Sequence, residues 1–259
     1  MTKTVAIANQ KGGVGKTTTS INLASCLAHL GESCLIIDMD PQSNSTIGIG
    51  ILDPAELANN NIFDVLIGEK TLEQIIKKTA IPNLFIAPST TDLAAAEVYL
   101  TKMENRESKL KNAIAALPQS FRFIIIDCPP SLGFLTINSL IASNSVLIPM
   151  QCEFFSLEGL DQLSQTISAL TQQYDLELEG VLFTMYDSRT NLAYQVIDEV
   201  KKHFYDKVYE TKIPRNIKLA EAPSFGIPAL KYDPQGKGTI AYMDFAQEFL
   251  IRQNKRNGY

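Results

Sequence analysis

The stretch that decides the fold is Gln10–Thr18, which reads Gln-Lys-Gly-Gly-Val-Gly-Lys-Thr-Thr. It lies between a short apolar run, Val5–Ala8, and an amphipathic segment, Thr17–Leu30. A strand, a glycine-rich loop and a helix in this order form the setting of a phosphate-binding loop. The glycines let backbone N–H groups approach a polyphosphate, and the positive N-terminal end of the helix attracts the same anion. The stretch therefore predicts a nucleotide site.

One position of this loop departs from the usual spacing. The pattern Gly-x-x-x-x-Gly-Lys-Ser/Thr requires a glycine six residues before Lys16, but Gln10 stands there and Lys11 follows it. Lys16 is expected to reach the β- and γ-phosphates, and the Thr17 hydroxyl to bind Mg²⁺. Thr18 is expected to bond the α-phosphate. The predicted nucleotide-binding residues of the loop are Lys11, Gly12, Gly13, Val14, Gly15, Lys16, Thr17 and Thr18.

Aspartates end two other apolar runs. Phe123–Asp127 has the form of a Walker B strand, and Asp127 is expected to hold Mg²⁺ through a water, at the edge where open α/β sheets bind ligands. Asp38 and Asp40 follow the second run and project the same way if the strand stays extended. Asp40 lies nearer the loop and is the predicted residue for orienting the attacking water, while Asp38 would stabilise Lys16 or the metal shell. One aspartate after a strand could equally be a helix cap, so the prediction depends on all three.

Apolar runs rich in valine and isoleucine alternate with helix-like segments along the whole chain. Most runs are apolar throughout, which is typical of strands buried on both faces of a parallel sheet. The pattern predicts an α/β fold, a doubly wound, mostly parallel sheet flanked by helices on both faces, as in P-loop NTPases. One domain, 1–259, is the expected organisation. The predicted strands are Val5–Ala8, Cys34–Asp38, Leu84–Ala87, Phe123–Asp127, Val146–Met150, Val181–Met185 and Val208–Ile213, and the predicted helices include Thr17–Leu30, Leu157–Tyr174 and Leu192–Phe204.

Two stretches lack such periodicity. Gly48–Asn61 contains Asp53-Pro54 and three consecutive asparagines, which predicts a surface loop. The polar tail Arg252–Tyr259 predicts a frayed end.

The composition is that of a globular protein, with 259 residues of which 45% are hydrophobic and 20% charged. No apolar run reaches the roughly 18 residues of a membrane span, and the chain opens on a strand without room for a signal peptide, so a cytoplasmic location is expected. The four cysteines form no C-x-x-C pair and are expected to be reduced. The net charge is −5, yet residues 186–259 carry 12 Lys+Arg against 9 Asp+Glu, which allows a local basic face.

These residues resemble the ParA/MinD class of P-loop ATPases with a deviant Walker A loop, and within it the small Soj-type ParA partition proteins. The resemblance covers essentially the whole chain. The strings that carry it are Asn9–Thr19, Asp38–Ser43, Phe123–Leu132, Met185–Val196 and Ile213–Lys231, the last with Ile-Pro-Arg-Asn and Glu-Ala-Pro-Ser-Phe-Gly.

The resemblance implies a mechanism. Lys11 would be the signature lysine that crosses a homodimer interface to the partner's nucleotide, and with Lys16 and Asp40 it would form the catalytic set. Pro214 and Asn216 would contact adenine, so the nucleotide would be ATP or ADP with Mg²⁺. The ATP-bound dimer would bind DNA without sequence preference on the nucleoid and be released when a ParB-type partner stimulates hydrolysis. The implied DNA-binding residues are Arg189, Arg215 and Lys218.

Three alternatives stay open at this stage. A MinD-like protein would lie on a membrane through a C-terminal amphipathic helix, but Met243, Ala246, Phe249 and Leu250 form a stripe expected to pack on the sheet. An iron–sulfur relative would need paired cysteines, and Cys128 has no partner at suitable spacing. A DNA-coating scaffold would use ATP only as a dimerisation switch. Longer plasmid ParA proteins carry an N-terminal helix-turn-helix for operator binding, which is not expected here because the chain opens on its first strand.

Overall fold

The computed structural model describes residues 2–153 and 156–256. Its strands form one sheet in the order β3-β4-β2-β5-β1-β6-β7, in which every pair is parallel except β3 with β4. The predicted doubly wound, mostly parallel sheet is confirmed. The strands are β1 (Lys3–Ile7), β2 (Cys34–Asp38), β3 (Lys77–Lys78), β4 (Leu84–Ala87), β5 (Phe123–Asp127), β6 (Ser145–Gln151) and β7 (Glu177–Thr184).

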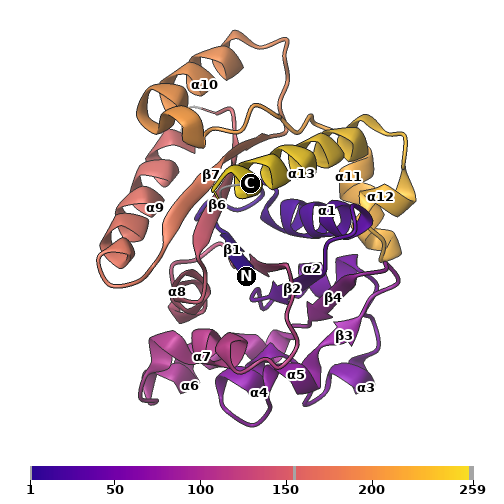
Figure 1. Ribbon diagram of the computed structural model, residues 1–259, viewed down its shortest axis with the longest axis vertical. Helices are drawn as coiled ribbons and strands as arrows, with labels where there is room; N and C mark the ends of the chain where they lie inside the picture. The colour runs from indigo at the N-terminus through magenta and orange to yellow at the C-terminus, as the bar shows by residue number, and fades with distance from the viewer. Residues whose placement is uncertain (1, 154–155, 257–259) are drawn as a thin grey trace.

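Helices cover both faces of this sheet. Figure 1 shows α1 and α13 together on one side of it, with α4 to α8 on the other. The predicted helices Thr17–Leu30, Leu157–Tyr174 and Leu192–Phe204 correspond, with slightly different bounds, to α1, α9 and α10. The helices are α1 (Lys16–His29), α2 (Asn44–Gly48), α3 (Pro54–Leu57), α4 (Ile62–Leu66), α5 (Leu72–Ile75), α6 (Ala96–Thr101), α7 (Lys109–Ala115), α8 (Phe134–Ile141), α9 (Ser156–Thr171), α10 (Asn191–Phe204), α11 (Ile217–Glu221), α12 (Ala229–Tyr232) and α13 (Lys237–Arg256).

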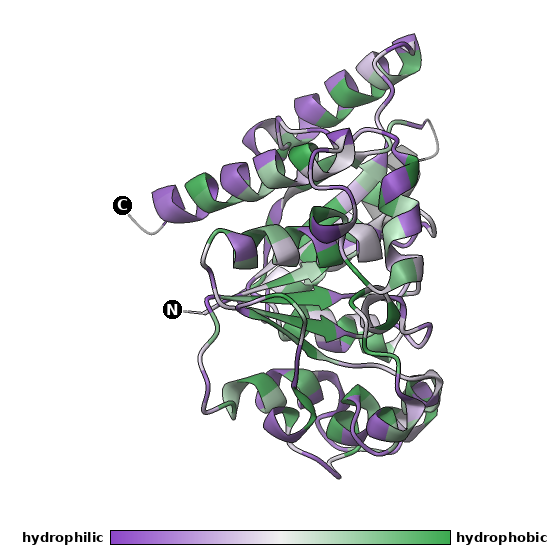
Figure 2. Cartoon of the chain, turned by 90° about the vertical axis from the view of Figure 1, so that its right-hand side faces the viewer, coloured by the Kyte–Doolittle hydropathy of each residue, from purple (hydrophilic) through white to green (hydrophobic). Residues whose placement is uncertain are grey.

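The wholly apolar strands contribute side chains to two separate hydrophobic cores, because successive side chains of a strand point to opposite faces of the sheet. On β2, Ile36 packs in the cluster that contains Leu27 of α1 and Phe249 of α13. Its neighbours Leu35 and Ile37 pack in the other cluster, which α4 and α7 to α10 complete. Figure 2 shows the hydrophobic strands at the centre and mixed helices around them. The carboxyl ends of the central strands are thereby held rigidly at one edge.

The predicted strand Val208–Ile213 is wrong. This segment lies beside β7 and makes an isolated bridge between Val181 and Val208, but it does not continue as a ladder. The amides of Glu210 and Thr211 donate to the Glu248 carboxylate of α13, at 3.0 and 2.9 Å. The Tyr209 and Ile213 amides donate to carbonyl oxygens of β7. Between them the Glu248 carboxylate binds two successive amides, so the alternation of a continuous strand is lost.

Three further expectations need correction. Gly48–Asn61 is not all loop, because it contains α3, whose first turn is capped by the side chain of Asp53. The tail is ordered as helix through Arg256, and the remaining residues, 257–259, lie outside the described part of the chain.

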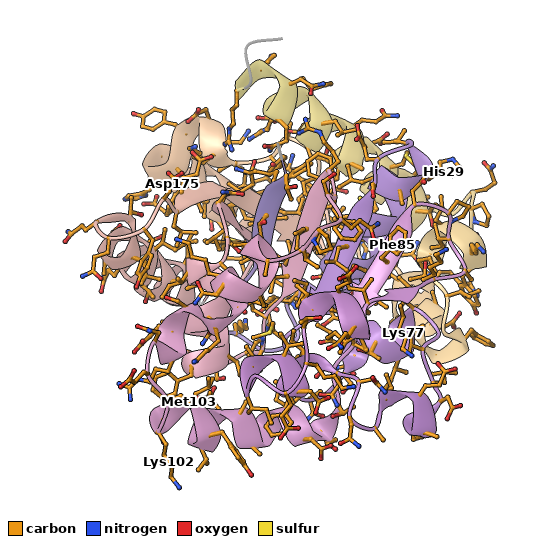
Figure 3. All side chains as sticks on the ribbon, turned by 60° about the horizontal axis from the view of Figure 1, so that its bottom comes forward. His29, Lys77, Phe85, Lys102, Met103 and Asp175 are labelled. Atoms are coloured by element: carbon orange, nitrogen blue, oxygen red, sulfur yellow. The ribbon has the colours of Figure 1, made fainter. Side chains whose placement is uncertain are left out.

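The edge strand β3 was not predicted, because it consists of only two lysines. Figure 3 labels Lys77 of β3 and Phe85 of the neighbouring β4.

A buried carboxylate, Glu179 of β7, joins the two ends of the chain. It accepts hydrogen bonds from Ser145 Oγ at 2.7 Å and Gln253 Nε2 at 2.7 Å. Arg256 lies 2.8 Å from it, and Lys3 Nζ lies 3.3 Å from it. Burial alone would raise the pKa of this carboxyl, but the two cations and the hydrogen bonds outweigh it and hold the pKa below its usual value. The carboxylate is therefore charged and fully partnered at neutral pH.

Glu179→Gln is expected to lower the free energy of unfolding by about 2 kcal/mol near neutral pH, because Lys3 and Arg256 lose their buried counter-charge. Since the pKa is lower in the folded chain, this stabilisation is complete above the unfolded value near 4.5 and is lost as the pH falls through the folded value. Urea unfolding near pH 7 and near pH 3 measures both. The exposed Glu104→Gln is the control, because Glu104 contacts neither Lys3 nor Arg256, and an equal effect of Glu179→Gln at both pH values would contradict the prediction.

Candidate nucleotide-binding site

The phosphate loop leaves β1 and enters α1 with two glycines in the left-handed region. Gly13 has φ of 73° and Gly15 has φ of 88°, which glycine adopts without steric penalty. Helix α1 begins at Lys16, and Gly15 before it has no side chain to cap the helix. The amides of the first turn therefore form an uncapped, positive helix end of the kind that attracts phosphate.

The strand register brings Asp127 to this loop. Asp127 of β5 is in register with Ile7 of β1 on one side and with Asp38 of β2 on the other. It is fully buried and accepts hydrogen bonds from Ser20 Oγ at 2.9 Å and Ser45 Oγ at 2.7 Å. Asp127 thus lies against α1, one strand away from the start of the phosphate loop.

Asp38 is fully buried as well, and its partners belong to the segment that follows it. One oxygen accepts from the amide and hydroxyl of Thr46, at 2.9 and 2.7 Å, and the other from the Asp40 amide at 3.1 Å. Burial raises the pKa of Asp38, and the charge of Asp127 raises it further. Among the hydrogen bonds of the described residues, none joins Asp38 to Lys16. Asp38 therefore orients the segment that carries Asp40.

Lys16 and Asp40 are nearly buried, each 7% exposed, and open into one cavity. Burial lowers the pKa of Lys16, and the charges of Asp127 and Asp40 oppose that shift. Asp40 accepts a hydrogen bond from the Gln42 amide at 2.9 Å. The cavity has a volume of about 390 Å³ and is lined by Gly12, Gly13, Gly15, Lys16, Thr17, Thr18, Asp40, Gln42, Asn44, Pro130 and Met185. The structure thus brings together the loop and the aspartate predicted to act with it.

Lys11 does not line that cavity. Its Nζ forms an ion pair with Glu153, just beyond β6, and its amide donates to Asn9 Oδ1 at 2.9 Å. The side chains of Lys11 and Glu153 are 36% and 50% exposed. Lys11, the residue expected to be the signature lysine, therefore lies at the rim of the cavity on an accessible surface.

A smaller hollow of about 80 Å³ adjoins the loop and contains both residues predicted to contact the base. Asn216 caps α11 through its Oδ1, which accepts from the Lys218 amide at 2.8 Å, so its NH₂ group is the donor left for a ligand. Apolar walls with one directed amide suit a flat heteroaromatic ring. The hollow is lined by Gly15, Thr18, Thr184, Met185, Ile213, Pro214, Asn216, Leu219, Ala220 and Tyr242.

The sequence has close relatives over nearly its whole length. It is 52% identical over 250 residues to the sporulation initiation inhibitor protein Soj of Bacillus subtilis, covering 96% of this chain and 98% of that one. It is 45% identical to the chromosome partitioning protein ParA of Myxococcus xanthus, covering 98% and 89%. Residues 2–180 match a family described as an AAA domain. The chain belongs to the ParA/Soj family of partitioning ATPases.

The ParA/Soj fold also has solved counterparts. The structure of cobyrinic acid a,c-diamide synthase from Mycobacterium smegmatis, with bound ADP and magnesium, matches with a TM-score of 0.85 and 37% identity. The match covers 98% of this chain and 96% of that one. The sheet and its flanking helices are therefore those of a known nucleotide-binding architecture.

The two arginines that the ParA/Soj resemblance relates to DNA lie beside the smaller hollow. An isolated bridge between Tyr186 and Pro214 joins the segments that carry them. Arg189 pairs with Asp187 through Nε at 2.9 Å and Nη2 at 2.6 Å, and its side chain is 86% exposed. Arg215 is exposed and close enough to Asp187 to help hold the pKa of that carboxyl below its usual range, after the larger effect of Arg189. Both cations thus lie around one exposed carboxylate.

Lys218, the third basic residue of this ParA/Soj set, is paired separately on α11. Its Nζ lies 2.8 Å from Glu221 and 5.4 Å from the ring centre of Tyr232. A phosphate that binds Lys218 has to displace an exposed carboxylate, and exposed ion pairs cost little to break.

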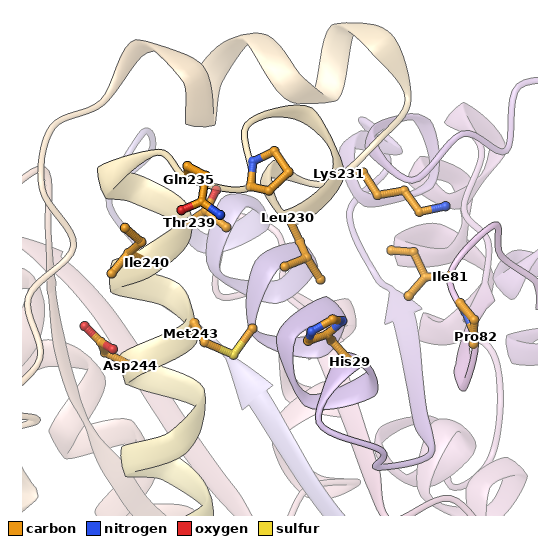
Figure 4. Close-up of a pocket in the computed structure, with 11 residues that line it drawn as sticks. His29, Ile81, Pro82, Leu230, Lys231, Gln235, Thr239, Ile240, Met243 and Asp244 are labelled. Atoms are coloured by element: carbon orange, nitrogen blue, oxygen red, sulfur yellow. The ribbon is translucent and has the colours of Figure 1, made fainter.

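A separate hollow of about 510 Å³ contains no residue of the ParA/Soj phosphate loop. Figure 4 shows it between His29, at the end of α1, and the N-terminal half of α13 with Ile240 and Met243. Its lining includes none of the glycines of that loop and neither Lys16 nor Asp40. The cavity at the phosphate loop, although smaller, is therefore the candidate nucleotide site.

Sequence reasoning missed several residues of the ParA/Soj site. Gln42, Asn44, Pro130 and Met185 line the phosphate cavity, and all four lie within strings that carry the family resemblance or directly beside them. Met185 gives a structural signal, because it adopts φ of 49°, which is uncommon for a residue with a side chain. Met185 lines both hollows and so lies where they adjoin.

Proposed function

We propose that the chain is an ATP-switched DNA-partitioning ATPase. ATP binding would produce a homodimer that binds DNA without sequence preference, and hydrolysis stimulated by a ParB-type partner would release it. The observation that carries this proposal is the convergence of Lys16, Asp40 and Asp127 on a glycine-rich loop, with Lys11 at the accessible rim. In this proposal the whole chain acts as one domain and associates with the nucleoid.

The oxygen donors at this site fit Mg²⁺. The Mycobacterium relative was solved with magnesium bound. The Thr17 side chain lies close enough to the Asp127 carboxylate to oppose the rise that burial causes in its pKa, and hard oxygen donors are those that Mg²⁺ prefers. Mg²⁺ held there would neutralise charge on the β- and γ-phosphates. The chain's own contribution is to position the polyphosphate with loop amides and Lys16. ATP is favoured as the nucleotide because Asn216 can present its amide to adenine.

Hydrolysis in this proposal depends on Asp40 and Lys11. Asp40 lines the phosphate cavity and its backbone is held by Asp38, so its carboxylate can orient a water toward the γ-phosphate. Lys11 would supply a cation from the second chain to the charge that develops on the transferred group.

The MinD-like alternative is opposed by the packing of α13. Ala246 and Phe249 are fully buried against α1 and the sheet, so the apolar stripe is not presented to a membrane. No helix among the described residues is long and apolar enough to cross a membrane. The iron–sulfur alternative is opposed by Cys128, which is buried rather than at a surface that a cluster could bridge.

The decisive experiment measures retention on non-specific duplex DNA with ATP, over a series of salt concentrations. Binding should require ATP, be absent with ADP, and weaken steeply as salt rises, because phosphate contacts release counterions. Equal retention with ADP, or retention indifferent to salt, would overturn the proposal. Comparing ATP turnover with and without DNA and a ParB-type partner separates an ATPase from a scaffold that merely binds ATP.

Asp40→Ala is expected to lower ATP turnover about 100-fold while the affinity for MgATP changes little, because a water-orienting group acts in the transition state. With hydrolysis blocked, the ATP-bound, DNA-retained dimer should accumulate. Turnover and DNA retention are measured together, with Asp175→Ala, an exposed carboxylate on the α9–β7 connection, as the control. Parental turnover in Asp40→Ala would remove Asp40 from this role.

Arg189→Glu is expected to weaken DNA retention at least about tenfold and to make its salt dependence shallower by about one unit per subunit. The dimer itself should form normally, which size-exclusion chromatography with ATP checks. Lys102→Glu makes the same charge change at an exposed position of α6's end and should have little effect. Unchanged retention would place the DNA surface elsewhere.

A further inference from the structure

The last residues of β6 and β7 form hydrogen bonds to the backbone of the phosphate loop. Gln151, the last residue of β6, donates from Nε2 to the Gly13 carbonyl oxygen at 2.8 Å. Thr184, the last residue of β7, donates from Oγ1 to the Val14 carbonyl oxygen at 2.7 Å. Neither residue belongs to the loop motif, and neither was expected at the site.

These two hydrogen bonds control the direction of two amides. A trans peptide unit is planar, and its C=O and N–H point in opposite directions. When the Gly13 carbonyl is turned toward Gln151, the Val14 N–H is turned the opposite way. The same relation joins the Val14 carbonyl, held by Thr184, to the Gly15 N–H. The two amides between the loop's glycines are thereby aimed away from the strands, toward the side where a polyphosphate would lie.

Both hydrogen bonds are made by side chains whose positions are fixed by further contacts with the sheet. Thr184 is 2% exposed and also lies 3.2 Å from the Met150 carbonyl oxygen of β6, so its hydroxyl sits between two strands and the loop. Gln151 Nε2 lies 3.1 Å from the sulfur of Met185, the left-handed residue that follows β7. Two residues before Gln151 on β6, the Pro149 carbonyl oxygen accepts a hydrogen bond from the Asn9 side-chain amide at 2.8 Å. The loop is therefore tied to β6 and β7 on one side and continues into α1 on the other.

We propose that Gln151 and Thr184 are positioning residues for phosphate binding: they preset the Val14 and Gly15 amides toward the nucleotide's phosphates. This inference rests on the proposed nucleotide-binding function. Preset amides need no reorganisation when the anion arrives, so their contribution is to affinity for the polyphosphate and not to the base. Rotating either peptide plane would turn a carbonyl oxygen, which repels phosphate, toward the ligand.

A merely structural role is the competing explanation, because a buried carbonyl needs a donor wherever it lies. The two explanations differ in what a variant loses. A structural residue affects stability of the nucleotide-free chain, whereas a positioning residue affects phosphate contacts in a chain that is still folded. Thr184→Val keeps the shape and removes the hydroxyl, and Thr184→Ser keeps the hydroxyl. Gln151→Met keeps the length of the side chain and removes its amide, at a half-buried site.

The test measures MgADP affinity by calorimetry and amide chemical shifts by NMR in the full chain. Thr184→Val and Gln151→Met should each weaken MgADP binding about fivefold, the effect of losing one hydrogen bond, while Thr184→Ser stays within about twofold of the parent. The downfield shift on MgADP binding should diminish at Gly15 in Thr184→Val and at Val14 in Gln151→Met. Gln173→Met, at an exposed glutamine, is the matched control.

Parental affinity and parental amide shifts in both variants would overturn the inference, and so would Thr184→Ser as impaired as Thr184→Val. If Thr184→Val does not fold, Gln151→Met and its Val14 shift decide alone. Failure of the parent chain to bind MgADP would instead overturn the proposed nucleotide-binding function, so the two failures are distinct.

Discussion

Replacing Lys11 with alanine is expected to lower ATP turnover about a thousandfold while MgATP still binds, because a cation supplied to the transferring phosphoryl group acts only in the transition state. In the single chain Lys11 forms an ion pair with Glu153 and does not line the phosphate cavity. Its removal should therefore leave that cavity unchanged. Steady-state turnover and nucleotide affinity measure the two effects separately, with exposed Lys102→Ala as the control. Parental turnover would contradict the prediction.

Mixing two inactive variants tests whether Lys11 acts across the dimer. In a mixed dimer of Lys11→Ala and Asp40→Ala, the Lys11→Ala chain keeps its own Asp40 and would receive Lys11 from its partner. That one site should work, so an equimolar mixture should recover about a quarter of parental turnover, given random pairing of a two-fold dimer. If Lys11 acted within its own chain, no site in the mixture would be complete and no activity would return.

Replacing Lys16 with alanine is expected to weaken MgATP binding about a thousandfold and thereby abolish turnover and DNA retention. The Lys16 ammonium is nearly buried in the cavity, close to Asp127 and Asp40, so its charge is the loop's main fixed attraction for the β- and γ-phosphates. Removing it also leaves two carboxylates without a counter-charge where the phosphates would lie. Binding of a fluorescent ATP analogue measures the loss, and thermal unfolding of the nucleotide-free variant shows that the fold survives. Affinity within tenfold of the parent would contradict this prediction.

The central sheet was predictable because its strands are buried on both faces and so are apolar throughout. Failures occurred where a tertiary contact overrides a local pattern. Val208–Ile213 looks like a strand, and both of its ends contact β7. Between them the Glu248 carboxylate binds two amides, so no continuous ladder forms. The edge strand β3 has no apolar pattern at all, since Lys77 and Lys78 form it by pairing with β4.

The residues of the candidate site likewise fall into those that a local motif predicts and those that only the tertiary fold brings together. The phosphate loop is a contiguous string whose chemistry depends on its own glycines and Lys16, so the sequence predicts it directly. Gln151 and Thr184 reach the loop only because β6 and β7 follow β1 in the sheet order. Glu153 likewise meets Lys11 across 142 positions of sequence. No local spacing connects such residues, and only the strand order brings them together.

The Lys11–Glu153 ion pair has a consequence for how the switch responds to its surroundings. In the proposed dimer, Lys11 leaves a carboxylate of its own chain and meets a phosphate of its partner's nucleotide. One anionic contact replaces another, so the number of close charge pairs on Lys11 is conserved. Salt screens both contacts, so its effect largely cancels in the free-energy difference between the single chain and the dimer. Dimerisation should therefore depend far less on ionic strength than DNA binding does. A rise in salt concentration that weakens DNA binding should leave the homodimer assembled.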